Sequence, residues 1–287
     1  MRAIYKRELR SYFQSMTGCV FVAFLVIFTG IYFTAYNLNM GYPYFSYTLS
    51  GSLIVFLVGI PLITMKSFSE ERKNKTDQLL LTAPVSVGKI IIGKYLALIT
   101  VFLIPVGIIC CYPLIMGKYG VVSYPMAYTA ILGFVLLGAA QIAVGVFLSS
   151  LTENPVIAAV MTFIALFVCY MITGISSLIP DTSASSLGIY ILLVAILTFF
   201  IYHMIQNLWI AGGIGIVGEA SLLITYLLKP TLFESGIQKF LEIFDITSHF
   251  DDFTNGIFDL NGIVYFLSVI VIFMFLSVQT ITKRRWN

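Results

Sequence analysis

Charged residues are scarce in this sequence. They make up 10% of its 287 residues, whereas hydrophobic residues make up 59%, and the mean hydropathy is +0.98. A soluble globular protein carries roughly 25% charged residues, so this chain cannot cover a water-exposed surface with charge. The same composition excludes a disordered chain, a collagen and a secreted disulfide scaffold. We therefore predict an all-α polytopic membrane protein.

Cysteine and histidine, which supply most metal ligands, are also few. The four cysteines are Cys19, Cys110, Cys111 and Cys169. All four lie in apolar runs without paired spacing, which indicates small buried side chains and no disulfide framework. The two histidines are His203 and His249. His249 precedes Asp251 and Asp252, but one histidine beside two acids favours a hydrogen-bonded loop residue over a metal site.

Several long apolar runs fill most of the chain. A helix that crosses the ~30 Å hydrocarbon core needs ~20 mostly apolar residues. The runs are Cys19–Tyr36, Leu49–Met65, Tyr95–Gly117, Ala127–Ser150, Pro155–Ile179, Leu187–Leu228 and Ile263–Ile281. Leu187–Leu228 is long enough for two helices that turn near Gln206, which predicts eight crossings. If that run were re-entrant, six crossings would remain.

The distribution of basic residues sets the predicted orientation. If the N-terminus is cytoplasmic, all of the 16 Lys and Arg residues except Lys118, Lys229 and Lys239 lie on the cytoplasmic side. This asymmetry is typical of the positive-inside rule. We expect a multi-pass protein of the plasma membrane with both termini in the cytoplasm. The formal net charge of +3 is too small to indicate a nucleic-acid partner.

We expect a single transmembrane domain over residues 1–287, with three segments outside the bilayer that are long enough to have functions. Met1–Met16 has apolar residues at helical spacing with basic residues between them, which predicts an interfacial helix on the cytoplasmic headgroups. Its polar residues include Arg7, Glu8 and Arg10. The helix could serve only as a membrane anchor or also as a docking surface for a partner. Lys229–Asn261 predicts one or two amphipathic helices outside the cell.

The segment Lys66–Lys94 is the only long cytoplasmic loop in this topology. Its charges from Glu70 to Asp77 favour a solvated helix that continues the second span. Three leucines then precede Pro84, which breaks a helix, and Ser86 could cap the next helix. The leucines are Leu79, Leu80 and Leu81. An apolar patch in a cytoplasmic turn indicates an interface.

Patterns of catalytic chemistry are weak throughout the chain. Gly88–Tyr95 nearly matches a phosphate-binding loop, but Tyr95 cannot replace the small hydroxyl residue that binds magnesium, and no buried strand precedes it. The pair Glu70-Glu71 lacks the neighbouring histidines of an intramembrane metalloprotease. Glu219 is an intramembrane candidate, because a charge in mid-membrane costs at least ~2.5 kcal/mol. It could contact substrate or protons, or be a hydrogen-bonded structural acid.

Two stretches resemble the ABC-2-type permeases, the membrane subunits of ABC transporters, in the branch of gliding-motility and copper-enzyme-maturation systems. The first carries Glu71-Arg72, Thr76, Leu79-Leu80-Leu81, Pro84 and Gly93-Lys94. The second runs from Ile246 to Phe266 and is followed by the basic tail Lys283–Trp286. The chain departs from the family pattern at Asn74-Lys75, where a glycine commonly precedes the threonine. It also departs at Leu187–Leu228, which looks like a hairpin added to a six-span core.

The resemblance implies that the cytoplasmic loop is a coupling element that docks into a separate ATPase subunit. The implied coupling residues are Glu70, Glu71, Arg72, Thr76, Leu79, Leu80, Leu81, Pro84, Gly93 and Lys94. ATP and magnesium would then bind the partner, and this chain would bind no cofactor. The resemblance also implies that two permease chains, identical or related, form a substrate pathway for export. The alternative is a stand-alone membrane enzyme or a secondary carrier, for which clustered acids and histidines or several intramembrane charges would be expected.

Overall fold

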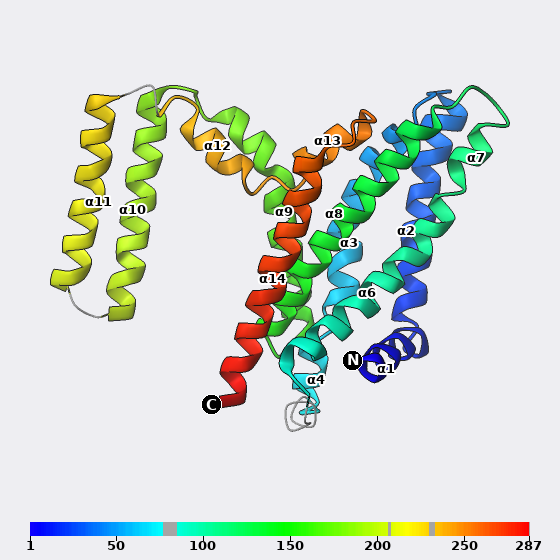
Figure 1. The fold of residues 1–287 in the computed structure, drawn as a ribbon, viewed down its shortest axis with the longest axis horizontal. Coiled ribbons are helices and arrows are strands. Elements are labelled where there is room, and N and C mark those ends of the chain that lie inside the picture. The colour runs from blue at the N-terminus through cyan, green and yellow to red at the C-terminus, as the bar shows by residue number, and fades with distance from the viewer. Residues whose placement is uncertain (77–84, 206–207, 230–232, 287) are drawn as a thin grey trace. The chain divides into compact units, whose positions relative to one another are not determined.

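The computed structural model describes residues 1–76, 85–205, 208–229 and 233–286. Every regular element within these residues is a helix, which confirms the predicted all-α class. The helices are α1 (Arg2–Gln14), α2 (Thr17–Phe33), the π-helix η1 (Thr34–Asn39), α3 (Ser46–Thr64), α4 (Ser69–Lys73), α6 (Val87–Ile109), α7 (Tyr112–Met116), α8 (Tyr124–Leu151), α9 (Pro155–Leu178), α10 (Ser183–Ile205), α11 (Leu208–Leu228), α12 (Gly236–Glu242), α13 (Ser248–Thr254) and α14 (Leu260–Trp286) (Figure 1).

Six helical stretches among the described residues are long and apolar enough to cross a membrane. They are Thr17–Asn39, Ser46–Lys73, Val87–Met116, Tyr124–Leu151, Pro155–Leu178 and Leu260–Arg284. The predicted six-span core is thus present, and the protein is a multi-pass membrane protein. The third span begins earlier than Tyr95, the start expected from hydropathy, because α6 already starts at Val87. Lys94 therefore lies inside a helix.

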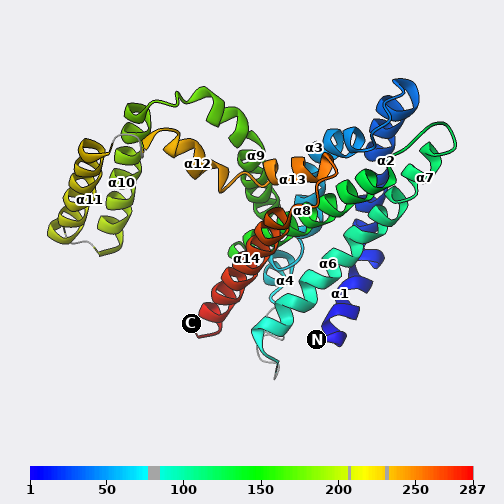
Figure 2. The same ribbon diagram turned by 45° about the horizontal axis from the view of Figure 1, so that its top comes forward.

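The chain forms two compact units. Unit 1 comprises Met1–Val168 and Ile246–Asn287, and unit 2 comprises Cys169–Asp245. In unit 1, α8 packs against α3, α6, α13 and α14, while α1 packs along α6 and α2 along α3 (Figure 2). The central position of α8 explains why it is buried along most of its length, with the other helices arranged around it.

Aromatic side chains and glycines build the core of unit 1 around α8. The rings of Phe56 and Phe134 lie 4.5 Å apart between centroids, and Phe102 packs edge-on to Phe56 at 5.7 Å. A Cβ atom at Gly138 would lie 2.3 Å from the Phe102 ring, and one at Gly145 would lie 2.4 Å from the Thr64 hydroxyl. Small residues on α8 thus let α6 and α3 approach closely.

Unit 2 contains the helical hairpin predicted for Leu187–Leu228. Its helices α10 and α11 pack along each other, and Gly215 and Gly218 on α11 face Thr198 and Val194 on α10. The short helix α12 packs on α10. Helix α12 and, in unit 1, α13 lie between Lys229 and Asn261, where one or two amphipathic helices are expected. The amphipathic character and the outer location of this segment stay predictions.

Candidate functional site

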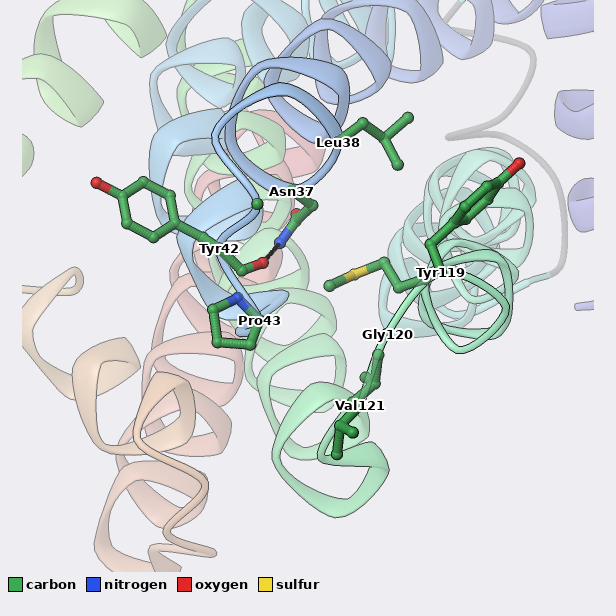
Figure 3. Close-up of a pocket in the computed structure, with 10 residues that line it drawn as sticks. Asn37, Leu38, Tyr42, Pro43, Tyr119, Gly120 and Val121 are labelled. Carbon is green, nitrogen blue, oxygen red and sulfur yellow. Dashed lines mark hydrogen bonds between the residues drawn. The ribbon is translucent and has the colours of Figure 1, made fainter.

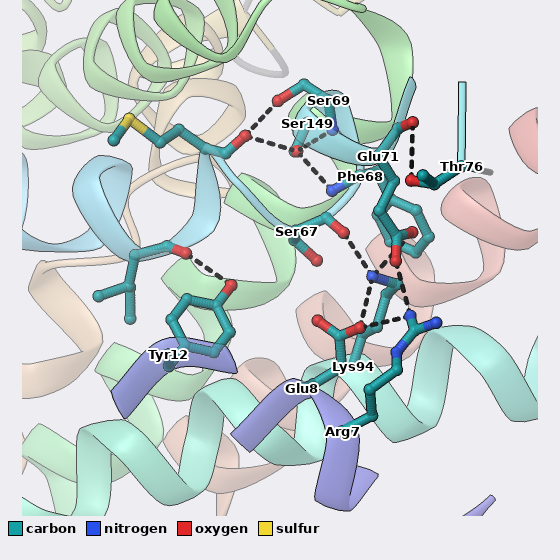
Figure 4. Close-up of polar contacts among 12 residues, drawn as sticks. Arg7, Glu8, Tyr12, Ser67, Phe68, Ser69, Glu71, Thr76, Lys94 and Ser149 are labelled. Atoms are coloured by element: carbon teal, nitrogen blue, oxygen red, sulfur yellow. Dashed lines mark hydrogen bonds and ion pairs between the residues drawn. The ribbon is translucent and has the colours of Figure 1, made fainter. Parts of the chain in front are cut away.

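Lys94 is the centre of a buried charge cluster in unit 1. Its side chain is 1% exposed. The ammonium Nζ lies 3.0 Å from Glu8 Oε1, 3.0 Å from Glu71 Oε2 and 2.7 Å from the backbone carbonyl of Ser67 (Figure 4). The contact with Glu8 is a hydrogen bond, whereas that with Glu71 is an ion pair without hydrogen-bond geometry. The Phe68 ring also lies 5.0 Å from Nζ, within reach of a cation–π interaction.

Arg7 completes the cluster from the first helix. One guanidinium nitrogen, Nη2, lies 2.8 Å from Glu8 Oε1 and 2.6 Å from Glu71 Oε1. The cluster therefore contains two cations and two carboxylates, whose charges sum to zero. This balance is needed because a buried ammonium is costly unless opposite charges pair with it. Because its members come from α1, α4 and α6, the cluster joins the two flanks of the predicted coupling loop to the N-terminal helix.

Burial and charge shift the pKa values of two groups on α1. Burial alone lowers the pKa of the Arg7 guanidinium, but the hydrogen bond to Glu8 and the charge of Glu71 outweigh it, so the pKa is raised. Burial raises the pKa of Tyr12 well above its ordinary value, and the carboxylates of Glu8, Glu70 and Glu71 raise it further. At neutral pH Arg7 is therefore charged and Tyr12 is a neutral hydrogen-bond donor.

Helix α1 presents a polar stripe to the rest of unit 1. Tyr5 Oη lies 3.0 Å from the Thr100 hydroxyl, and Tyr12 Oη donates to the carbonyl of Ile63 at 3.0 Å. Glu8 lies between these tyrosines on the same face of the helix. Tyr5 and Tyr12 belong to the helically spaced apolar residues of this segment, but their hydroxyls make these hydrogen bonds to α6 and α3. The hydrogen bonds and Glu8 turn this face inward, while Phe13, Met16 and the basic Arg10 remain exposed.

Glycine 93 allows α1 and α6 to approach at the level of the cluster. A Cβ atom at this position would lie 3.3 Å from Cγ2 of Ile4 on α1. A larger side chain would therefore push α1 away from α6, which also carries Lys94 one residue later. Gly93, one of the predicted coupling residues, thus contributes to the geometry of the charge cluster.

The short helix α4 ends in a turn that explains a departure from the family pattern. Lys75 has a positive φ of 56°, the left-handed conformation in which glycine is favoured. The Thr76 amide donates to the carbonyl of Glu71 at 2.9 Å, and the Thr76 hydroxyl reaches the same carbonyl at 3.2 Å. The chain therefore keeps the backbone turn of a C-terminal cap although a lysine occupies the position that commonly carries glycine.

We predict that Lys75→Gly stabilises the protein by about 1 kcal/mol, because a non-glycine residue in the left-handed region costs about that much. The matched control is Lys73→Gly, which places glycine inside α4 and should destabilise by about 1 kcal/mol. The measurement is the apparent melting temperature of each purified variant. A lower melting temperature for Lys75→Gly than for the wild type would contradict the assignment of strain to this turn.

Two cavities lie at opposite ends of the helices of unit 1. A cavity of about 370 Å³ adjoins the charge cluster and is lined by residues that include Arg7, Glu71, Lys66, Asn74 and Lys94. A cavity of about 650 Å³ lies between the turn after η1 and the loop after α7 (Figure 3). Its lining includes Tyr42, Tyr119, Val121 and Met116 and carries no charged side chain.

A comparison with protein families decides the identity of the chain. Residues 30–233, more than half of the sequence, match the ABC-2 family transporter proteins. The chain belongs to the ABC-2 transporter family. Neither the comparison with curated proteins nor that with solved structures gave a match. As a member of this family, the chain is a membrane permease of an ABC transporter, a transport component and not itself an enzyme.

The permease brings several of the predicted coupling residues to one end of unit 1. Glu71 and Lys94 meet Arg7 and Glu8 there, and Gly93 lies against Ile4 of the same helix α1. Glu70 is half-buried in α4, and Arg72 Nη1 donates to the carbonyl of Thr152 at 3.3 Å. Leu79, Leu80, Leu81 and Pro84 lie outside the residues that the structure describes, so their role stays a prediction.

Glu219, the intramembrane candidate, belongs to unit 2 of the permease. It lies in α11 one residue after Gly218 and is half-buried. Gly218 and Gly215 face α10, which places Glu219 beside the contact between the two helices. Its role as a substrate contact or as a structural acid stays a prediction.

The surroundings of His249 bear on the question of a metal site. His249 lies in α13, and its ring stacks on Tyr265 with centroids 3.9 Å apart. Its Nδ1 lies 3.4 Å from the Ser248 hydroxyl. No group of three or more His, Cys, Asp or Glu residues that could hold a metal occurs within the described residues. The sequence predicts a hydrogen-bonded loop histidine; the contact with Ser248 is present, but His249 lies in the helix α13 and not in a loop.

Proposed function

We propose that this permease is driven by a separate ATPase subunit, which docks at the end of unit 1 that carries the charge cluster. The observation that carries the proposal is the bridge by Lys94 and Arg7 between Glu8 on α1 and Glu71 on α4. Lys94 lies in α6, the next span, so the helices on both sides of residues 74–86 are held in a fixed geometry. A loop anchored in this way can transmit a push as a rigid body.

The distribution of charge supports a cytoplasmic location for this end. The N-terminal helix with Arg2, Lys6 and Arg10 and the C-terminal end of α14 with Arg284 both belong to unit 1. Arg284 Nη2 donates to the carbonyl of Leu151, where α8 ends. Helix α4 packs against the same end of α8. Basic residues from three parts of the chain thus gather at one end, as the positive-inside rule favours for the cytoplasmic face of the plasma membrane.

The proposal extends to the assembly and to the direction of transport. Two permease chains, identical or related, form the pathway in the lipid bilayer, and ATP with Mg²⁺ binds only the ATPase partner. Export is supported by the resemblance to the gliding-motility and copper-enzyme-maturation branch. Because no charged side chain lines the outer cavity at Tyr42 and Tyr119, release of an apolar or amphiphilic substrate at that end is chemically reasonable.

Photo-crosslinking tests the proposed docking site. A benzophenone amino acid at Leu80 is expected to crosslink to the ATPase subunit in native membranes, because an apolar residue of the docking loop lies in the contact. The same probe at Val121, which is 93% exposed in the loop after α7 at the other end of unit 1, serves as the control and should give no ATPase adduct. An ATPase adduct from Val121 and none from Leu80 would contradict the proposal.

A further inference from the structure

Ser149 on α8 holds the corner between α3 and α4. Its Oγ accepts hydrogen bonds from the backbone amides of Phe68 at 3.2 Å and Ser69 at 3.3 Å. The same hydroxyl donates to the carbonyl of Met65 at 3.2 Å (Figure 4). Ser149 is 0% exposed, so water cannot replace these bonds. One side chain on a neighbouring helix therefore satisfies three backbone groups of the corner.

The amides of Phe68 and Ser69 need a partner outside their own helix because of where they lie, whereas the carbonyl of Met65 also accepts a hydrogen bond from the Ser69 hydroxyl. The last carbonyls of a helix and the first amides of the next have no partner within their own helix. The residue before α4, Phe68, provides no side-chain cap. Ser149 supplies from α8 what a capping residue would supply locally, so the orientation of α4 depends on α8.

A second contact joins the same two helices, and a third continues to α14. Arg72 of α4 is 8% exposed and donates from Nη1 to the carbonyl of Thr152, the residue that ends α8. Arg284 near the end of α14 donates to the carbonyl of Leu151 at 3.2 Å and lies 3.9 Å from Glu153. Helix α14 also packs along α8. The three helices are thus in continuous contact at this end.

We propose that Ser149 and Arg72 are positioning residues that transmit movement of the docked loop to α8 and α14. The inference rests on the proposed function, because it takes an ATPase as the source of the movement. Buried hydrogen bonds between packed helices favour movement as one body over independent bending, since breaking them would leave backbone groups unsatisfied. Loss of Ser149 should therefore separate loop movement from movement of α8, while the ATPase stays bound.

Spin labels on α2 and α8 measure this transmission without a substrate. The labels replace Ile31 and Leu132, which are exposed, in a variant whose four native cysteines are alanine. The permease is purified with the ATPase that accompanies the wild type and is trapped with ATP and vanadate. We expect a change in the distance between the labels on the order of 2 Å. In Ser149→Ala the change should fall to less than about half of this value, with ATP turnover retained.

Matched variants separate transmission from general destabilisation. Ser150→Ala removes a hydroxyl that is equally buried but binds only the carbonyl of Phe147 in its own helix, so it should behave as wild type. Ser149→Thr keeps the hydroxyl and should restore the change. Arg72→Gln tests the second contact if Ser149→Ala does not insert, with the exposed Lys73→Gln as its control.

The outcomes distinguish this inference from the proposed function. A full distance change in Ser149→Ala or in Arg72→Gln would overturn the inference and leave the proposed function intact. An unchanged distance in the wild-type complex would also overturn it. Failure of any ATPase to accompany the wild-type permease would instead overturn the proposed function.

Discussion

Replacement of Lys94 by methionine is expected to destabilise the permease strongly. The substitution keeps the length of the side chain but removes the buried cation, so Glu8 and Glu71 would face each other with only the half-exposed Arg7 as counterion. Breaking a buried ion pair by removing one partner costs about 3–5 kcal/mol. At 2–4 °C per kcal/mol, a loss of about 3 kcal/mol lowers the melting temperature by roughly 6–12 °C. The measurement is the melting temperature of purified protein.

The control substitution lies on the same helix. Lys89→Met removes an exposed lysine near the start of α6 and should change the melting temperature little. Glu71→Gln in the Lys94→Met background removes one of the two carboxylates that would share the single cation Arg7, so part of the stability should return. A Lys94→Met variant as stable as Lys89→Met would show that the cluster does not hold α1, α4 and α6 together.

The spans and the helical hairpin could be predicted from the sequence because they depend on local composition. A run such as Pro155–Ile179 must be helical in a membrane, where every backbone polar group needs a partner within its own segment. A run that is too long for one crossing predicts two helices, and α10 ends at Ile205 while α11 begins at Leu208. Both predictions follow from residues that are close in the chain.

The charge cluster could not be predicted, because its members are far apart in the sequence. Glu8 and Lys94 are each ordinary in their own segments, and no local pattern shows that they form an ion pair. Apolar spacing alone also could not show that the Tyr12 hydroxyl donates to the carbonyl of Ile63, a residue 51 positions away in the chain. Ser149 gave no signal either, since a serine near the end of a helix is common. Lys94 and Glu71 both belong to the motif that resembles the family's coupling loop. That motif indicated that each residue has a role, but it did not show that their side chains form an ion pair.

Replacement of Leu80 by aspartate is expected to weaken ATPase binding strongly. If the docked loop buries this leucine in the ATPase, aspartate places an unpaired charge in the contact. A cost of about 3 kcal/mol corresponds to roughly 100-fold weaker binding at 1.4 kcal/mol per tenfold. The charge cluster does not include Leu80, so membrane insertion and the melting temperature of the permease should remain near wild type.

The amount of ATPase that copurifies with tagged permease tests the ATPase coupling most directly. Leu80→Met keeps the apolar contact, and Val121→Asp places the same charge on the exposed loop after α7, so both should retain wild-type recovery. We predict that the Leu80→Asp permease inserts normally into the membrane. Its affinity for the ATPase should fall to roughly a hundredth of the wild-type value, so that little ATPase copurifies. Undiminished recovery with Leu80→Asp would contradict docking of the ATPase on this loop.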